Sequence, residues 1–496
     1  MPPLDELRLE EPSDLRMATE AEAVWVVPFS WEVGEHRHRP MVKRGVTVRF
    51  KPRGDDPVGP VSHGTDFISK ATGGLAAPSA SPPASTSSPT AATAAASSSG
   101  PGPHTPAPSP NEPGPLPERS PADSHIELIF PFSSNATLRH QYQRFMTDRM
   151  RFGLLLEDLD TLAADIAARH SGLSNRVLLT AAIDRIQWLR DSVVGEVTMA
   201  HDLRAGGQVV WAGRSSMEVR IELYSCDRRS SPPDVWNFIG LAYFVFVSRT
   251  PDRTAAADVP PLTPRTEREK ALFEAGKAHM QSRTHRRESH WARKPPTAAE
   301  VSLVHDLVRN QHLYRKSPHA QHSMHGQRGP SGAQQDSVPM RDTELQSSTL
   351  MHSQDRNAFN VIFGGHLLRL AYEHAAATAA MFAGEYCEPV SMDDVAFLQP
   401  VPIATLLRLT GQVVYTEGPV VRVHVRATKL KPGAPEQNVV TNVFSFAFAS
   451  SGAVRRVVPE TMVEAMEYVL GHRQHAADTA SRAVAESHAR AVLSRL

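Results

Sequence analysis

An internal repeat constrains this chain more than any other feature of its sequence. Residues 207–223, GQVVWAGRSSMEVRIEL, align without a gap with residues 411–427, GQVVYTEGPVVRVHVRA. In each segment apolar residues alternate along a run that is interrupted in the middle, which predicts two strands joined by a tight turn. A chain that carries the same structural unit twice is expected to fold as two similar units that pack against each other.

Other segments repeat in the same order around these hairpins. A helical pattern that starts at Arg151 matches one that starts at Phe363, and a strand-like segment from Leu178 matches one from Pro389. Each unit is therefore predicted to contain one long helix followed by several antiparallel strands. A single long helix must bury its apolar face against a sheet. The sequence thus predicts an α+β chain of two fused hotdog domains, each a long central helix wrapped by an antiparallel sheet, which form an intrachain pseudo-dimer.

Shifts in composition set the expected domain boundaries. Residues 76–121 are almost entirely Ala, Ser, Thr, Pro and Gly, a composition that cannot bury enough apolar surface to offset the loss of chain entropy. The predicted order is an amino-terminal extension with short strands and no assigned function (1–75), a disordered linker (76–121), hotdog domain one (122–285), an inter-domain linker (286–345), hotdog domain two (346–475) and a helical tail (476–496).

Global composition excludes several classes of protein. Lys and Arg together number 53, as do Asp and Glu, so the net charge of zero does not favour a nucleic-acid or membrane-surface partner. Cys226 and Cys387 are the only cysteines, which excludes a disulfide framework and a Cys-based zinc site. No apolar run approaches the ~18 residues of a membrane-spanning helix. We expect no metal or redox cofactor, and we expect His319, His322 and His325 to lie in a solvated loop.

Several sequence blocks resemble a known family. They are SHIELIFPF, RFGLLLEDLDTL, GRSSMEV, RNAFNVIFGG, VSMDDVAFLQPV, TNVFSFAF and VVPETMVEAMEYVLGHRQH, and they span about residues 124–475. In this order they resemble the acyl-CoA thioesterases with tandem hotdog domains. The resemblance implies hydrolysis of fatty acyl-CoA to free fatty acid and CoA, a homotrimer of double-hotdog chains, and a mitochondrial location. The acidic amino terminus is a poor transit peptide, so a cytosolic location also stays open.

Asp160 breaks the pattern of the first long helix. On a helical wheel Leu155, Leu159, Leu162 and Ile166 form the stripe that should face the sheet, whereas Asp160 falls within an arc of small apolar residues. A carboxylate on a buried face is costly unless it is paired or used. The alternatives are a catalytic base and an acid in a salt-bridge network, and the wheel does not separate them.

The second long helix opens with polar and small residues. Asn357 and Asn360 precede Gly364 and Gly365 at the predicted helix start. Glycines there allow a ligand to approach the unpaired backbone N–H groups, which could hold the oxyanion that develops on a thioester carbonyl. The structural alternative is an asparagine N-cap followed by a tight turn.

Alignment of the repeats favours a site divided between them. When Gly153 is set opposite Gly365, Asp160 falls opposite Tyr372, so each repeat has lost what the other keeps. The thioesterases that the chain resembles use such a split site, with an amide on one repeat and a helix acid on the other. Some of them carry the amide or acid immediately before the residues I, F, G and G, where this chain has Val361. Either Asn357 or Asn360 could therefore be the functional amide, and Asp148 keeps a weaker second site conceivable.

The predicted mechanism needs no covalent nucleophile. Asp160 accepts a proton from water as the water attacks the thioester, an asparagine positions that water, and the Gly364 and Gly365 amides stabilise the tetrahedral oxyanion. For the CoA nucleotide the best candidate is the turn Gly213, Arg214, Ser215 and Ser216, which offers a guanidinium, two hydroxyls and backbone donors; a polar hairpin tip is the structural alternative.

Two other functions compete with hydrolysis. A non-catalytic hotdog protein could bind acyl-CoA or acyl carrier protein, or serve as a scaffold, and the register difference at Val361 supports it. A hotdog hydratase acting on enoyl-CoA would need an Asp–His pair beside the substrate. His366 follows Gly365, but the sequence does not place an acid beside it.

Overall fold

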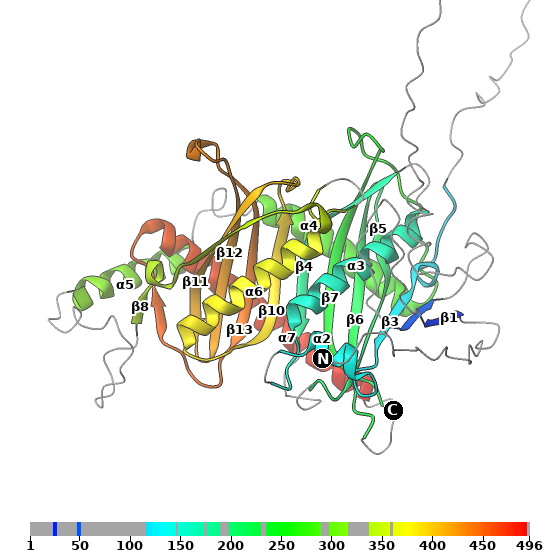
Figure 1. The fold of residues 1–496 in the computed structure, drawn as a ribbon, viewed down its shortest axis with the longest axis horizontal. Helices are drawn as coiled ribbons and strands as arrows, with labels where there is room; N and C mark the ends of the chain where they lie inside the picture. Colours follow the sequence, from blue (N-terminus) through cyan, green and yellow to red (C-terminus); the bar gives the residue numbers. More distant parts are fainter. Residues whose placement is uncertain are drawn as a thin grey trace, which may run out of the picture.

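The fold is built around one large antiparallel sheet. The structure, a computed structural model, describes residues 23–26, 47–50, 116–144, 147–172, 176–188, 198–229, 235–288, 297–315, 337–357 and 361–493. Within these ranges the sheet has twelve strands in the order β1-β2-β3-β5-β6-β7-β4-β10-β13-β12-β11-β9. Strands of the first repeat make up one half of the sheet and strands of the second repeat the other (Figure 1).

The first half of the sheet consists of β1 (Ala23–Val26), β2 (Thr47–Phe50), β3 (Ile126–Phe130), β5 (Asp202–Ala212), β6 (Ser216–Cys226), β7 (Asn237–Arg249) and β4 (Val177–Trp188). The second half consists of β10 (Glu388–Phe397), β13 (Val439–Ala449), β12 (Val420–Leu430), β11 (Leu406–Glu417) and β9 (Leu345–Leu350). Antiparallel pairing of β4 with β10 joins the halves, with Asp393 opposite Arg185. A separate parallel pair is formed by β14 (Arg456–Val458) and β8 (Ser337–Pro339).

The two repeated hairpins occupy equivalent places. β5 pairs with β6 and β11 pairs with β12, and each pairing has its irregularity at the same repeat position, Val210 in one and Val414 in the other. A bulge inserts one unpaired residue and increases the local twist. The shared bulge shows that the sequence repeat is a repeat of backbone geometry as well.

Helices cover both faces of the sheet. α3 (Phe152–Ser171) and α6 (Gly364–Ala383) lie side by side on one face, whereas α4 (Glu267–Glu288) and α7 (Met462–Leu493) lie on the other (Figure 1). A side chain at Gly276 of α4 or at Gly471 of α7 would collide with a bulky residue of the sheet, Trp211 or Tyr415. These glycines let both outer helices approach the sheet closely.

The remaining helices are short or peripheral. They are α2 (Ala136–Tyr142), α5 (Ala298–Arg315) and the single 3₁₀ turns η1 (Pro121–Ser124), η3 (Met340–Thr343), η4 (Ser353–Asp355) and η5 (Pro435–Gln437). No helix among the described residues is long and apolar enough to cross a membrane.

Three expectations need correction or fall outside the described residues. The segment 286–345, predicted as an inter-domain linker, contains α5 and β8, and Leu307 and Val304 of α5 are buried. The predicted tail 476–496 is mostly the end of α7, which begins at Met462. Residues 76–115 and the histidines at 319, 322 and 325 lie outside the described residues.

Several polar residues of α3 are buried as well. Glu157, Asp158 and Thr161 are all buried, since α2 and α6 pack against α3. The hydroxyl of Tyr142 in α2 donates to Asp158. Arg369 of α6 donates to Glu157 at 3.0 Å. Two of these buried acids, Asp158 and Glu157, are thus held by partners from neighbouring helices.

Candidate active site

Asp160 lies in the middle of α3. Its side chain is fully buried. The hydroxyl of Thr180 in β4 donates to Oδ1 over 3.2 Å, which fixes the orientation of the carboxylate. Oδ2 accepts no hydrogen bond of ordinary geometry from the described residues. Buried polar atoms are almost always bonded, so Oδ2 is available for a group that enters from outside.

The unbonded oxygen faces the amino terminus of α6, which belongs to the other repeat. A Cβ added at Gly364 would lie 3.3 Å from Oδ2, and one added at Gly365 would lie 3.2 Å from it. The N-cap is Phe363, whose side chain cannot accept a hydrogen bond from the helix, and the first turn closes with the Leu367 amide on the Phe363 carbonyl at 3.2 Å. The amides before Leu367 therefore have no acceptor within the helix.

Burial dominates the electrostatics of this carboxylate. It raises the pKa of Asp160 to about 7, against the smaller opposing effects of the Thr180 hydroxyl and the Gly365 amide, and nearby Glu157 raises the pKa slightly further. A carboxylate with a pKa near neutrality is populated in both protonation states under physiological conditions, as a general base must be.

Ion pairs tie the two central helices together beside this site. Arg369 of α6 lies 3.0 Å from Glu157 of α3. Arg151, directly before α3, lies 3.2 Å from Glu373 of α6. The first pair is largely buried and the second is exposed, so the first contributes more to the alignment of the helices. Asp160 and the Gly364–Gly365 turn depend on this alignment because they come from different helices.

The loop before α6 holds Asn357 by its own backbone. The Asn357 amide donates to the Val361 carbonyl at 2.8 Å, and its Oδ1 accepts from the Val361 amide at 3.4 Å. The side-chain oxygen thus stabilises a turn in the loop and does not cap α6, whose N-cap is Phe363, so Asn357 is not the N-cap that the structural alternative expected. Asn360 lies outside the described residues. His366 and Asp355 lie 3.7 Å apart, so the structure places an acid beside this histidine that the sequence could not.

Comparison with known proteins identifies the family. Residues 359–436 match the model of the thioesterase superfamily. The human mitochondrial acyl-coenzyme A thioesterase 9 is 34% identical over 72% of this chain and 78% of its own length. The chain belongs to the acyl-CoA thioesterase family. The chloroplastic acyl-coenzyme A thioesterase 2 of Humulus lupulus is 31% identical over 70% of this chain and 79% of its own length.

The hotdog thioesterase fold has neighbours among solved structures. An acyl-CoA hydrolase from Staphylococcus aureus in complex with butyryl coenzyme A, coenzyme A and coenzyme A disulfide matches 32% of this chain and 99% of its own length, with 23% identity and a TM-score of 0.30. The predicted hotdog fold of this thioesterase family member is confirmed by the superfamily match.

Exchanging the roles of α3 and α6 defines a second, equivalent position in this acyl-CoA thioesterase, and that position is apolar. α3 and α6 match residue for residue, since both span 20 residues and end at a glycine with positive φ, Gly172 and Gly384. Tyr372 then occupies the position of Asp160, and Phe152 that of Gly364. A small pocket there is lined by apolar and aromatic groups that include Phe152, Trp188, Tyr372, Phe446 and Phe448. Asp148, considered for a weaker second site, is exposed.

The predicted CoA turn lies close to Thr180 in the sheet. Ser216 pairs with Val247 of β7, and Val247 pairs with Leu179 of β4. The turn is therefore two strand spacings, about 10 Å, from the strand that holds Asp160 in place. The side chain of Arg214 is 79% exposed and lies 3.7 Å from Asp258. The exposed guanidinium can reach a ligand, although Asp258 competes with an anion for it.

Two further cations near this turn were missed by the sequence reasoning. Arg176 lies directly before β4 and donates to the Ser171 carbonyl at 3.1 Å, at the end of α3. Asp258 and Arg119 both act on the pKa of Arg176, which burial lowers. Asp258 thus has Arg214 and Arg176 as cationic neighbours, and Arg119 lies close to Arg176. No sequence motif joins them; only the meeting of three distant segments brings them together.

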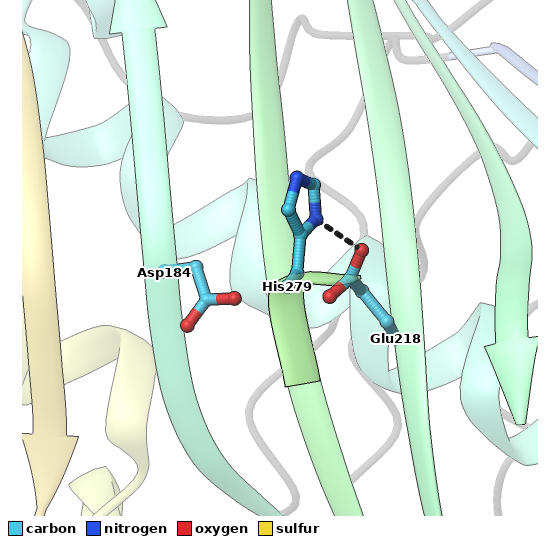
Figure 2. Close-up of side chains that lie close together, drawn as sticks. All are labelled: Asp184, Glu218 and His279. Carbon is cyan, nitrogen blue, oxygen red and sulfur yellow. Dashed lines mark hydrogen bonds and ion pairs between the residues drawn. The ribbon is translucent and has the colours of Figure 1, made fainter. Parts of the chain in front are cut away.

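One group of side chains has metal-ligand composition. Asp184 of β4, Glu218 of β6 and His279 of α4 place one ligand atom each within 4.8 Å of one another, and Figure 2 shows that the three side chains converge. The guanidinium of Arg283 already lies between the carboxylates, 2.7 Å from Glu218 and in contact with Asp184. We therefore interpret the group as an ion cluster, and the expectation that the chain needs no metal stays a prediction.

Proposed function

We propose that this chain hydrolyses fatty acyl-CoA to free fatty acid and CoA at one composite site between its two repeats. The observation that carries the proposal is the fully buried Asp160, whose unbonded Oδ2 faces the uncapped amino terminus of α6. A buried base and backbone amides that have no acceptor within their own helix are the two components that base-assisted hydrolysis of a thioester requires.

The chemistry follows from this geometry. Asp160 takes a proton from a water molecule as the water attacks the carbonyl carbon. The carbonyl oxygen, which becomes negative, accepts hydrogen bonds from the Gly364 and Gly365 amides, and the dipole of α6 adds to their effect. The tetrahedral intermediate then expels the CoA thiolate, which leaves readily without a strong acid. Thr180 keeps the carboxylate oriented through Oδ1, so that Oδ2 receives the proton.

The asparagine of the mechanism is proposed to be Asn357 or Asn360. The Oδ1 of Asn357 is used by the Val361 amide, which leaves its Nδ2 group as the donor that could hold the water or the carbonyl. Asn360 is kept as the second candidate because the side chain of Val361 cannot serve this role.

We further propose that the anionic end of CoA lies against the three arginines near the hairpin tip. From Asp160 to Ser171 the helix rises over 11 residues, about 16 Å, which suits an extended pantetheine arm that joins the thioester to the nucleotide. Arg214 and the donors of Gly213, Ser215 and Ser216 would contact the phosphates. Arg176 and Arg119 would add positive charge behind them.

The two halves of the sheet are proposed to act as hotdog units of an intrachain pseudo-dimer. The matched bulges and the matched helices support it. A homotrimer of such chains is proposed from the family resemblance, and light scattering at micromolar concentration should give three times the chain mass. A mitochondrial location is proposed from the relatives named for that organelle.

The decisive experiment is release of free thiol from a series of acyl-CoAs, from short to long, by the purified chain. Hydrolysis that is lost in Asp160→Asn supports the proposal. Binding of acyl-CoA without turnover in the wild-type chain would instead support a non-catalytic carrier or scaffold.

A second enzymatic function has one observation in its favour. The Asp355–His366 pair lies beside Gly365, and an enoyl-CoA hydratase would need such a pair. An enoyl-CoA substrate separates the two reactions, because hydration removes the conjugated double bond without release of thiol. Hydration that depends on His366 would replace our proposal.

A further inference from the structure

The outer face of the sheet carries two buried ion clusters that occupy equivalent places in the two repeats. The first cluster consists of Asp184, Glu218 and Arg283, and the second of Asp393, Arg422 and Asp478. In each, two carboxylates contact the guanidinium of the cluster's arginine, and a second basic group, His279 or Arg185, reaches at least one of the carboxylates. Arg283 lies 2.7 Å from Glu218 and contacts Asp184. Arg422 lies 3.2 Å from Asp393 and contacts Asp478.

The equivalence of the two clusters follows from the repeat and from the helix contacts. In the gap-free alignment Glu218 of β6 falls opposite Arg422 of β12. Gly276 and Gly471 mark equivalent points on α4 and α7, since each packs against the same bulky sheet position. Seven residues, about two turns, beyond each glycine stand the helix members of the clusters, Arg283 and Asp478.

The charges are exchanged between sheet and helix. In the first repeat the sheet offers two acids and α4 supplies the arginine. In the second repeat the sheet supplies Arg422 together with the acid Asp393, and α7 supplies the acid Asp478. Glu218 and Arg422 are both fully buried, so a helix of the wrong charge would leave like charges together without solvent, which is strongly destabilising.

We propose that these clusters determine which helix packs on which half of the sheet: charge complementarity directs α4 to the first repeat and α7 to the second. Two similar sheets in one chain present two similar surfaces, and either surface would otherwise accept either helix. Burial of the same charges in exchanged positions makes each correct pair attractive and each incorrect pair repulsive.

The second cluster also joins the repeats to each other. Arg185 of β4, in the first repeat, lies 2.8 Å from Asp393 and 3.6 Å from Asp478. It can reach them because the pairing of β4 with β7 is irregular between Ile183 and Arg185, so that neighbouring residues 184 and 185 both serve the outer face. α7 is therefore held across the junction of β4 and β10, on the opposite side of the sheet from the composite site.

The test is an exchange of charges within the first cluster of the full-length chain. Glu218→Arg alone and Arg283→Asp alone should each lower Tm by on the order of 10 °C, because each places like charges together in a buried position. The double variant Glu218→Arg/Arg283→Asp recreates the arrangement of the second cluster. It should recover at least half of the summed loss.

A matched control carries the same net charge and the same number of changes. Arg283→Asp combined with Asp478→Arg leaves both sheets unaltered and gives each helix the charge of the other. It should lose as much stability as the sum of its single variants. Recovery in this control, or no recovery in Glu218→Arg/Arg283→Asp, would overturn the proposal.

If the charge-reversed single variants do not fold, a milder double-mutant cycle keeps the idea testable. Glu218→Gln and Arg283→Met should show a favourable coupling that removes most of the second loss once the first is made, and additive losses would contradict the proposal. Thiol release by the rescued double variant reports on the composite site separately. The Tm results therefore stand even if the chain proves not to hydrolyse acyl-CoA.

Discussion

Replacement of Asp160 by asparagine should make this protein both inactive and more stable. Asparagine keeps the size of the side chain and can still accept the Thr180 hydroxyl through Oδ1, but it cannot take a proton from water. A general base contributes a factor of about 10²–10⁴ to the rate. At about 1.4 kcal/mol for each factor of ten, the barrier should rise by roughly 3–5 kcal/mol.

The gain in stability follows from the raised pKa. The folded chain holds the Asp160 proton up to a pH of about 7, whereas the ordinary pKa of an aspartate side chain is 3.8. Between these values the folded state binds more protons than the unfolded state, so the free energy of unfolding falls as the pH rises. The difference amounts to roughly 4 kcal/mol at about 1.4 kcal/mol for each pH unit. The neutral asparagine escapes this loss.

The assay is a pair of measurements on wild-type and Asp160→Asn protein. Thiol release gives kcat, and thermal unfolding between pH 4 and pH 8 gives the difference in stability. The stabilising effect should be absent near pH 4, grow as the pH rises and be complete above about 7. Full activity in a folded Asp160→Asn protein would refute the catalytic role. A stability difference that does not change with pH would refute the assignment of the buried charge.

Four further outcomes follow from the structure. The kcat/KM of the wild-type chain should rise with pH and level off above about 7, because only ionised Asp160 is a base and burial raises its pKa to that value; a profile flat from pH 5 to 9 would argue against it. Gly365→Ala should abolish thiol release in a folded protein, since its Cβ would lie 3.2 Å from Asp160 Oδ2 and 3.1 Å from a backbone carbonyl oxygen; retained activity would move the oxyanion site elsewhere. Arg214→Ala should raise KM for acyl-CoA about tenfold but leave KM for acyl-pantetheine unchanged, as expected for a contact to a non-reacting part of the substrate; equal effects on both substrates would contradict the phosphate contact. Zinc should raise the Tm of Arg283→Ala but not of the wild-type chain, since removal of the guanidinium leaves three ligand atoms within 4.8 Å of one another; stabilisation of the wild type would identify a metal site.

The sequence alone predicted the architecture because the same helix and hairpin patterns occur twice in it. A hairpin with alternating apolar residues, and a long helix with one apolar stripe, each specify local structure through periodicity, and their recurrence specifies two units. The unusual position of Asp160 was also visible in the sequence, because the helical wheel of a single helix is enough to show a carboxylate within an apolar arc. The glycine pair at the start of α6 was visible for the same local reason.

What the tertiary structure decided are the contacts between segments far apart in the chain. Only strand register brings the Thr180 hydroxyl to Asp160, and only the packing of α3 on α6 turns the carboxylate toward the amides of the other repeat. A helical wheel shows one helix and not its neighbours, so it could not reveal the burial of Glu157. The alignment of the repeats already placed the acid Glu218 opposite the base Arg422. The meaning of this exchange required α4 and α7 on the sheet, because a buried charge is interpretable only together with the residue that neutralises it.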